Sequence, residues 1–434
     1  MSVIAAAPPT VVQPPTVVPP SRVRRQLTVG VIVLATASLP LLRPAGPGNT
    51  GLADVGLIIA TLITALWLSG RGQRIYLPYA LPVMLTIASG ALAAIVSGGS
   101  GLPLIQDAFV FAWPIAVVNL ARDARMLDVL VKSWAYSGVV WGALLIVGVA
   151  AGLPWLTGIT ARDGVRASLT LGDPNLAASY FLCALFVLRA CQRPRMRKRR
   201  WVCCAIVVTA LGLTLSNGGV LTLLIATELG WVFGVARRRS LAGALAIGMV
   251  LIGVSAVAVL SVDFNVIADK AQQSTPLLRD SIGRQGESGG SRSTLFNTEV
   301  HMWLSANSLL GIGPGQIKTR LIEQDAPYAK MAHNDYMAAL VERGVIGAGA
   351  VILLAGTIAV RCRRIARPKA LPPEYAAVVP RPELLGALVV AVAVSAALYE
   401  TLHFRHVWAL FGLIAALELV PRRVPGTGQA SLRA

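Results

Sequence analysis

Long apolar blocks recur along the chain, and most charged residues lie in the gaps between them. Of the 434 residues, 55% are apolar and only 14% are charged, whereas average soluble domains carry about 25% charged residues. The blocks approach the roughly 17–25 residues that a helix needs to cross a bilayer core of about 30 Å. The pattern therefore predicts an all-α, polytopic membrane protein.

We expect about twelve transmembrane helices, counted by that length. The first block is short, and the last two are close enough to form a tight hairpin. The blocks lie near residues 27–42, 52–69, 77–98, 102–121, 126–152, 175–191, 201–217, 219–236, 241–261, 335–360, 383–402 and 404–420.

The expected organisation has five parts. A disordered, Pro-rich cytoplasmic tail (1–26) precedes helices 1–9 (27–261). A long extracytoplasmic loop with short helices (262–334) is followed by helices 10–12 (335–420) and a cytoplasmic tail (421–434). The basic residues before the first block also faintly resemble a signal peptide. The regular alternation of the later loops favours a retained first span.

The net charge of +19 arises from basic residues that cluster in every second gap. This distribution is the positive-inside pattern, which predicts cytoplasmic termini and a plasma-membrane location. A nucleic-acid-binding surface would not skip alternate loops. Residues 262–332 carry as many acidic as basic residues. The excess positive charge therefore indicates topology.

The cysteines lie in predicted spans or on the predicted cytoplasmic side, so no external disulfide is expected. They also lack the spacing of a metal site, and Cys203 and Cys204 are adjacent within a span. No metal and no cofactor are expected.

The long loop is predicted to be polar and mobile over 272–291 and to form an amphipathic helix over 294–310. Gly311, Gly313 and Gly315 would end that helix. The proposed apolar face consists of Leu295, Val300, Trp303, Leu304 and Leu309.

The four histidines lie at or near the predicted external face, where an imidazole suits proton transfer at neutral pH. We interpret His301, His403 and His406 as hydrogen-bonding residues at the membrane edge, and His333 as functional. Asn334 and Asp335, which follow it, can cap the next helix. Further on, Glu342 and Arg343 form an ionisable pair within a predicted span, which requires a partner or a cavity.

Several arginines lie in the predicted external segments, where their planar guanidinium groups suit phosphate binding. The sequence contains no P-loop, HExxH or sugar-nucleotide DxD motif. Several arginines near one histidine, above a membrane, indicate a lipid diphosphate as ligand. They are Arg166, Arg279, Arg284, Arg292 and Arg320.

Three segments together resemble the O-antigen ligase and O-antigen polymerase-like family of bacterial integral membrane glycosyltransferases. They are "VRASLTLGDPNLAASY", "SRSTLFNTEVHMWLSANSLLGIGPGQ" and "AHNDYMAALVERGVIG". The family has about twelve spans and one long external loop between late spans. The resemblance implies a polyprenyl-diphosphate-linked glycan donor and a metal-independent transfer with inversion at the anomeric carbon.

The resemblance also implies roles for individual residues. His333 would activate the acceptor hydroxyl, Arg292 would hold the diphosphate, and Arg166 is a second candidate phosphate contact. Further candidates for substrate binding are Asn175, Asn217, Arg284, Arg320, Asn334, Tyr336 and Glu342.

The chain departs from the family at one motif. The family often has Ser-Arg-Gly at the outer end of a middle span, and here Asn217 follows Ser216 in "LSNGG". The phosphate contact of the missing arginine must come from elsewhere or be weaker. Our hypothesis is that Arg166, Arg284 or Arg320 replaces it.

The sequence leaves several alternatives open. It does not separate a polymerase from a ligase, and it does not identify the sugar, the acceptor (a glycan, lipid or protein) or the oligomeric state. A transporter or a lipid-linked glycan flippase is the competing interpretation. It would require polar residues midway along several spans, and Lys132 is the main candidate. A structural membrane protein would not need the setting of His333 and Arg292.

Overall fold

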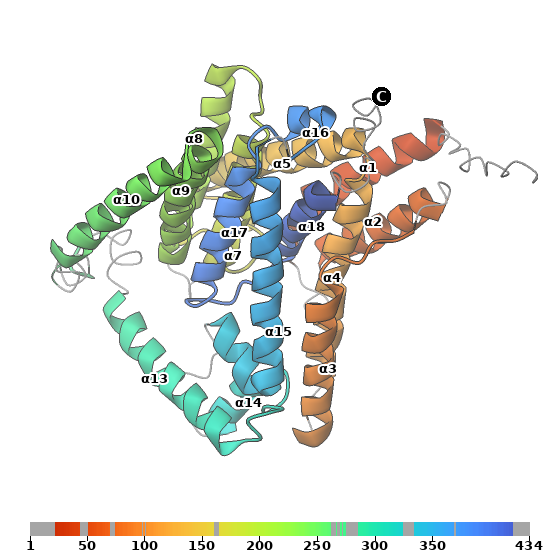
Figure 1. Ribbon diagram of the computed structural model, residues 1–434. Coiled ribbons are helices and arrows are strands. Elements are labelled where there is room, and N and C mark those ends of the chain that lie inside the picture. The colour runs from red at the N-terminus through yellow and green to blue at the C-terminus, as the bar shows by residue number, and fades with distance from the viewer. Residues whose placement is uncertain are drawn as a thin grey trace, which may run out of the picture.

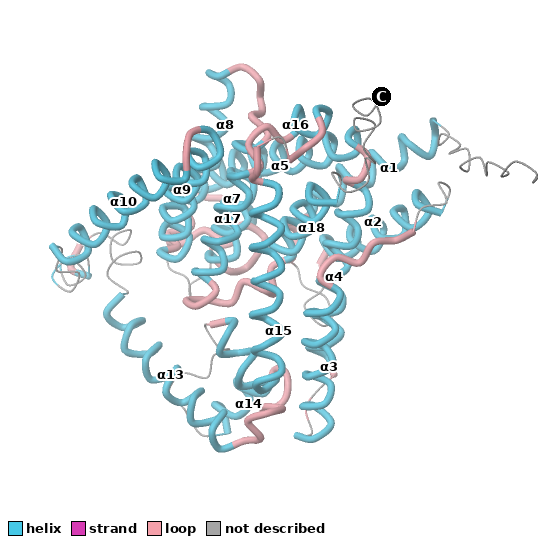
Figure 2. The backbone as a smooth tube through the Cα atoms, in the orientation of Figure 1, coloured by secondary structure: helices cyan, strands magenta, loops and turns pink. Residues whose placement is uncertain are grey.

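The computed structural model describes the chain over residues 22–43, 51–69, 74–97, 99, 101–159, 165–261, 266, 270, 272–274, 285–323, 334–368 and 370–419. Within these ranges all regular secondary structure is helical, as expected (Figure 2).

Each of the twelve predicted apolar blocks coincides with a helix. These are α1 (Arg22–Ser38), α2 (Leu52–Ser69), α3 (Ala80–Ser97), α4 (Leu102–Leu120), α5 (Ala124–Ala150), α7 (Pro174–Ala190), α8 (Arg197–Leu213), α9 (Asn217–Arg238), α10 (Leu241–Ser261), α15 (Asp335–Ile365), α17 (Glu383–Ser395) and α18 (Arg405–Leu419). Shorter or peripheral helices are α6 (Pro154–Thr157), α13 (Gln285–Ser305), α14 (Gln316–Glu323) and α16 (Pro373–Val378).

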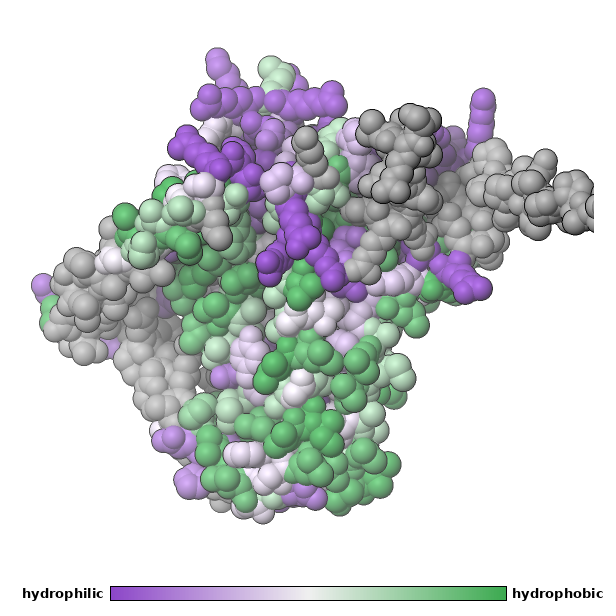
Figure 3. Space-filling model, in the orientation of Figure 1, coloured by the Kyte–Doolittle hydropathy of each residue, from purple (hydrophilic) through white to green (hydrophobic). Residues whose placement is uncertain are grey.

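Five helices of the described chain, namely α3, α4, α5, α9 and α15, are long and apolar enough to cross a membrane. The count of about twelve spans therefore stays a prediction. Large apolar side chains point outward, such as Met84 (68% exposed), Ile95 (79%) and Met249 (69%). Figure 3 shows a broad hydrophobic surface below a hydrophilic end where α8 and α16 lie. An apolar surface of this kind matches a multi-pass membrane protein.

Helix α7 lies at the centre of the bundle and is buried along nearly its whole length. It packs against α5, α8, α9, α17 and α18 (Figure 1). Small residues bring these helices close together. A Cβ on Gly138 of α5 would lie 2.3 Å from the Cβ of Ala184, and one on Gly219 of α9 would lie 2.5 Å from that of Ala178. Such contacts are typical of helix packing in membranes.

Helix α15 consists of two helical segments that meet at Gly344, which has φ 63° and ψ −166°. A Cβ on Gly347 would lie 3.0 Å from the carbonyl oxygen of Ala339, although eight residues of straight helix span about 12 Å. The chain thus turns sharply at Gly344. The predicted single span from 335 to 360 is therefore wrong in detail, because residues 335–343 form a separate short helix.

The loop helix also differs from the prediction. α13 begins at Gln285 and ends at Ser305, so it includes part of the segment predicted to be mobile and excludes Leu309. Its buried residues include Leu295, Glu299 and Met302, whereas Leu304 is 60% exposed. The buried face of α13 includes the acidic Glu299, so the spacing of apolar residues alone does not identify it. In Figure 1, α13 and α14 lie at the end of the molecule away from α8 and α16.

Candidate functional site

Arg166 lies between the loop that precedes α7 and the end of α8. Its Nε donates to the carbonyl oxygen of Thr214 at 3.4 Å, and its Nη2 donates to Oδ1 of Asn175 at 3.4 Å. Asn175 lies in the first turn of α7, after Asp173 caps that helix through the backbone N–H groups of Asn175 and Leu176. Two sequence-predicted residues, Arg166 and Asn175, are therefore in direct contact.

The same contacts reach the "LSNGG" motif at the start of α9. Ser216 is the N-cap of α9: its hydroxyl oxygen accepts from the N–H of Gly219, and its O–H donates to Oδ1 of Asn175 at 2.7 Å. Asn217 is the next residue and is exposed. Arg166 is thus linked through Asn175 to Ser216, the residue before Asn217.

The loop between α17 and α18, residues 396–404, connects this cluster to the start of α15. A Cβ on Gly218 would lie 2.7 Å from the Tyr399 ring, and the Tyr399 hydroxyl lies 3.3 Å from Oγ1 of Thr222 on α9. On the other side, the buried carboxylate of Asp335 accepts from the backbone N–H and the hydroxyl of Thr401, both at 2.7 Å. One loop therefore holds the beginnings of α9 and α15 together.

The first turn of α15 is held in place by four further hydrogen bonds. Asn334 is the N-cap, as predicted, and accepts from the N–H groups of Tyr336 and Met337. The N–H of Asp335 donates to the carbonyl oxygen of Ala396 at 2.8 Å, and the Tyr336 hydroxyl donates to that of Ala393 at 2.8 Å. The residue that follows His333 therefore belongs to a rigid structure.

The Gly-rich turn "GIGPGQ" wraps around the end of the short helix 335–343. The N–H of Ile312 donates to the carbonyl oxygen of Val341 at 2.9 Å, and that of Gly313 to Glu342 at 3.0 Å. The Glu342 carboxylate lies near the backbone N–H groups of Gly315 and Ile317 at the start of α14, which favour its charged form. Since Gly313 has φ 101° and Gly315 has φ 75°, only glycine suits this turn. The Gly-rich turn and the short helix 335–343 therefore form one structural unit.

Arg343 has the partner that the sequence required. Its guanidinium pairs with Asp107 of α4 and donates to the carbonyl oxygen of Thr86 on α3 at 3.1 Å. The ion pair fastens the turn at Gly344 to α3 and α4. We interpret Arg343 as structural.

Two carboxyl groups near these residues were missed by the sequence analysis. Glu299 on α13 is 2% exposed, and its Oε1 makes no hydrogen bond with the described chain. Burial, and then the nearby Glu342, raise the pKa of Glu299 to about 7. Glu400 lies in the connecting loop, where burial raises its pKa to about 7, helped by Asp335, Glu342 and Glu299 and opposed by His403.

His403 has a setting different from the membrane-edge role we predicted. Its Nε2 lies 3.7 Å from Oε2 of Glu400. Burial lowers the pKa of His403, but the carboxylates of Glu400, Asp107, Asp335 and Glu342 outweigh it, so the pKa is raised. The imidazole is nevertheless 52% exposed. The only sequence signal for these groups was the polar density of "YETLHFRH" between two apolar blocks. In the described chain these groups form no arrangement suited to a metal ion.

The remaining predicted residues have different outcomes. His333 and Arg284 lie outside the described residues. Arg292 falls within the range of α13, seven residues before the buried Glu299. Arg320 is exposed on α14, away from the Arg166 cluster in sequence and contacts. His406 is buried, and its Nε2 bonds with the Ser179 hydroxyl at 2.9 Å, so the expected hydrogen bond is present. Its position at the membrane edge stays a prediction.

Residues 202–352 match the family model described as O-antigen ligase. Over these residues the chain resembles O-antigen ligases. The match runs from α8 into the second segment of α15, and it includes the start of α9, α13 and the Gly-rich turn. Arg166, Asn175 and the connecting loop lie outside the matched residues. A comparison of the full chain with curated proteins finds no match. The family match, together with the apolar helices, indicates a glycosyl-transferring membrane enzyme of polysaccharide biosynthesis.

Proposed function

We propose that the protein transfers a glycan from a polyprenyl-diphosphate donor to an acceptor hydroxyl at the outer face of the plasma membrane, as a ligase or a polymerase. The observation that carries the proposal is the loop 396–404. It joins the Arg166–Asn175–Ser216 cluster to the start of α15, two residues after His333. The proposed phosphate contact Arg166 then belongs to the same framework as Asn334, the residue that follows the proposed base in the sequence.

In this proposal Arg166 supplies the phosphate contact that Asn217 cannot make. Its guanidinium bonds with Asn175 at the start of α7 and with Thr214 at the end of α8, so it requires little rearrangement to meet a diphosphate near the start of α9. Arg320, on α14, has no such support. Arg292 on α13 would contact the diphosphate from the opposite side and stabilise the charge that develops as it leaves.

The reaction exchanges one bond to the anomeric carbon for another. The acceptor hydroxyl oxygen attacks from the face opposite the diphosphate, the bond from carbon to the diphosphate oxygen breaks, and the configuration inverts. The hydroxyl proton passes to the imidazole of His333, and such a positioned base contributes about 10²–10⁴-fold in rate. Arginine side chains supply the positive charge, so the proposed mechanism requires no metal.

In this scheme Asn334, Tyr336 and Glu342 do not react themselves but hold the surrounding backbone in place. Asn334 and Tyr336 fix the first turn of α15, and Glu342 fixes the Gly-rich turn below it. Glu299, Glu400 and His403 lie close to this framework, and burial raises the pKa of the two glutamates to about 7. These groups are suited to bind polar sugar groups or to relay a proton.

The membrane arrangement belongs to the same proposal. Both termini are cytoplasmic, the segment 262–334 is extracytoplasmic, and residues 1–26 and 421–434 are cytoplasmic tails. The positive-inside distribution supports this orientation.

The test is glycan transfer by the purified protein from a polyprenyl-diphosphate donor. His333→Ala and Arg292→Ala are expected to lose at least about 100-fold in rate. Arg166→Ala should lose activity as well, whereas Arg320→Ala should not. Thermal unfolding of each variant separates loss of chemistry from loss of fold. Full activity of folded His333→Ala would overturn the proposal. Donor movement between leaflets without transfer would favour a flippase.

A further inference from the structure

Two adjoining cavities lie at the end of the bundle opposite the candidate site. The first, of about 110 Å³, is lined by Arg189, Gln192, Arg197, Arg200, Trp201, Cys204 and Arg381. The second, of about 310 Å³, is lined by Gly230, Trp231, Gly234, Val235, Arg238, Arg239 and Arg381. They share Arg381. Asn175 and Arg189 are 14 residues apart on α7, so about 21 Å of helix separates the two sites.

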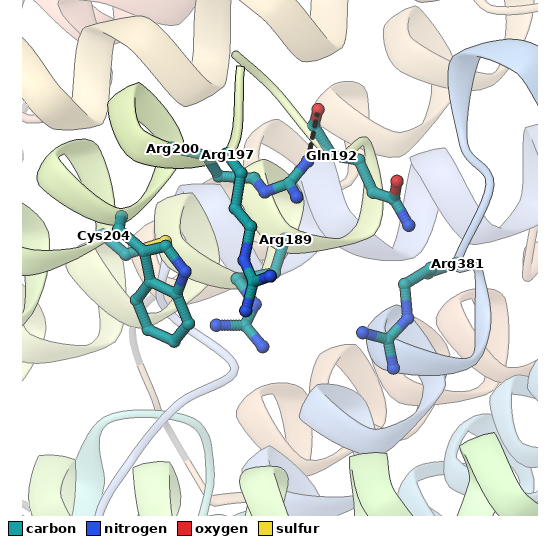
Figure 4. Close-up of a pocket in the computed structure, with 7 residues that line it drawn as sticks. Arg189, Gln192, Arg197, Arg200, Cys204 and Arg381 are labelled. Atoms are coloured by element: carbon teal, nitrogen blue, oxygen red, sulfur yellow. Dashed lines mark hydrogen bonds between the residues drawn. The ribbon is translucent and has the colours of Figure 1, made fainter. Parts of the chain in front are cut away.

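The first cavity is strongly basic and contains no carboxylate in its lining. Figure 4 shows the guanidinium groups of Arg189 and Arg197 beside each other, with Arg381 across from them. Arg381 donates to Oε1 of Glu383 at 3.2 Å, and Arg200 donates to the carbonyl oxygen of Gln192 at 3.1 Å. Arg189, Arg197 and Arg200 form no ion pair with a carboxylate in the described chain.

Guanidinium groups held this close repel one another, and an anion bound between them would offset that repulsion. Planar guanidinium groups bind phosphate oxygens in pairs, which makes an arginine-lined cavity a fitting phosphate site. The Arg189 guanidinium also lies over the Trp201 ring, 5.5 Å from its centroid, which fixes its direction. The cavity is therefore preorganised for an anion.

The surroundings of the cavities indicate which anion. Trp201 is 57% exposed, Val202 59% and Trp231 65%, so apolar side chains flank the arginines on the outer surface of α8 and α9. Tryptophan is typical of the boundary between acyl chains and headgroups. A free phosphate would contact the arginines but not these apolar groups. An anionic lipid would contact both, with its headgroup at the arginines and its apolar part at the tryptophans, and basic pockets between helices are known to bind lipid headgroups.

We propose that the two cavities bind one anionic glycerophospholipid, with its phosphate between Arg189, Arg197 and Arg381 and its glycerol region beside Trp231 and Val235. The site takes a lipid of the bilayer and is separate from the donor site, so the proposal does not depend on glycosyl transfer. Bound there, the lipid would join the ends of α7, α8, α9 and α17.

The test measures thermal unfolding of the full-length protein in a neutral detergent during titration with phosphatidylglycerol. Phosphatidylcholine and inorganic phosphate serve as the comparison ligands. Arg197→Gln and Arg189→Gln/Arg197→Gln remove lining arginines, and Arg195→Gln/Lys198→Gln removes two exposed basic residues of the same segment that do not line the cavities.

We expect phosphatidylglycerol to raise Tm in a saturable manner, and phosphatidylcholine and phosphate to have little effect. Each lining arginine removed should weaken the response about fivefold, which corresponds to about 1 kcal/mol per basic residue. The control variant should respond as the wild type does. An unchanged lipid response in Arg197→Gln and in the double variant would overturn the proposal, and so would equal stabilisation by inorganic phosphate.

Discussion

Glu299 is a buried carboxyl group whose ionisation opposes folding. Burial raises its pKa in the folded protein from an ordinary value of 4.5 to about 7. The unfolded chain therefore ionises first, and folding becomes less favourable as the pH rises from about 4.5 to about 7. At pH 8 Glu299→Gln is expected to raise Tm by about 2 °C or more, and at pH 5 to leave it nearly unchanged. Thermal unfolding at the two pH values measures this.

The matched control is Glu323→Gln on α14, because Glu323 is exposed. It should shift Tm little at either pH. A loss of stability at pH 8 in Glu299→Gln would contradict the prediction and show that the carboxylate has a stabilising partner.

Arg166 and Asn217 permit a rescue experiment. Arg166 contacts Asn175, which in turn bonds with Ser216, the residue before Asn217. Asn217 is exposed at the start of α9, where a longer side chain has room. We expect Arg166→Ala to lower kcat/KM for the lipid-linked donor at least tenfold, and Arg166→Ala/Asn217→Arg to recover most of that loss. Asn217→Gln in place of Asn217→Arg provides the control without charge. Equal activity of both double variants would show that charge at this position is not what matters.

The candidate site was predictable only in part at the residue scale. Arg166 and Asn175 were identified from motifs, and their contact follows from the fold. Glu299 and Glu400 were not identified, because a single acidic residue in a loop is usually solvated. Their significance comes from burial between elements far apart in sequence, which no local pattern reports.

At the scale of single elements, the turn inside α15 depends on one glycine. Gly344 has φ 63°, and a Cβ there would lie 2.1 Å from the carbonyl oxygen of Leu309. Gly344→Ala is therefore expected to destabilise the protein by about 2 kcal/mol or more, from the conformational cost and the clash together. Gly349→Ala is the control, because a Cβ at Gly349 meets nothing within 4 Å. Chemical or thermal unfolding of both variants should show a loss only in Gly344→Ala.

The same turn explains why the sequence misled us about this element. Residues 335–360 are apolar enough for one continuous span, and hydropathy does not register a change of direction. The signals that were present are Arg343 beside Gly344 and the Gly-rich turn some thirty residues earlier. They become interpretable only once the backbone contacts of Ile312 and Gly313 with residues 341–342 are known.

For the whole molecule, apolar blocks were enough to locate the bundle helices because lipid requires long hydrophobic segments whatever their neighbours are. Which helix lies at the centre was not predictable, since its neighbours α5, α17 and α18 are at least as apolar as α7. Its central place comes from small residues at its contacts, such as Ala178 and Ala184. The candidate site and the arginine-lined cavities then lie at the two ends of this one buried helix.

That arrangement predicts opposite accessibility of the two ends in cells. Lys318 on α14 and Lys198 on α8 are both exposed, and the positive-inside pattern assigns them to opposite sides of the membrane. In a background with the five cysteines replaced, Lys318→Cys should react with a membrane-impermeant maleimide in intact cells. Lys198→Cys should react only after the membrane is permeabilised. Labelling of both positions in intact cells, or the reverse pattern, would contradict the orientation and place the candidate site on the side of the membrane away from its proposed donor and acceptor.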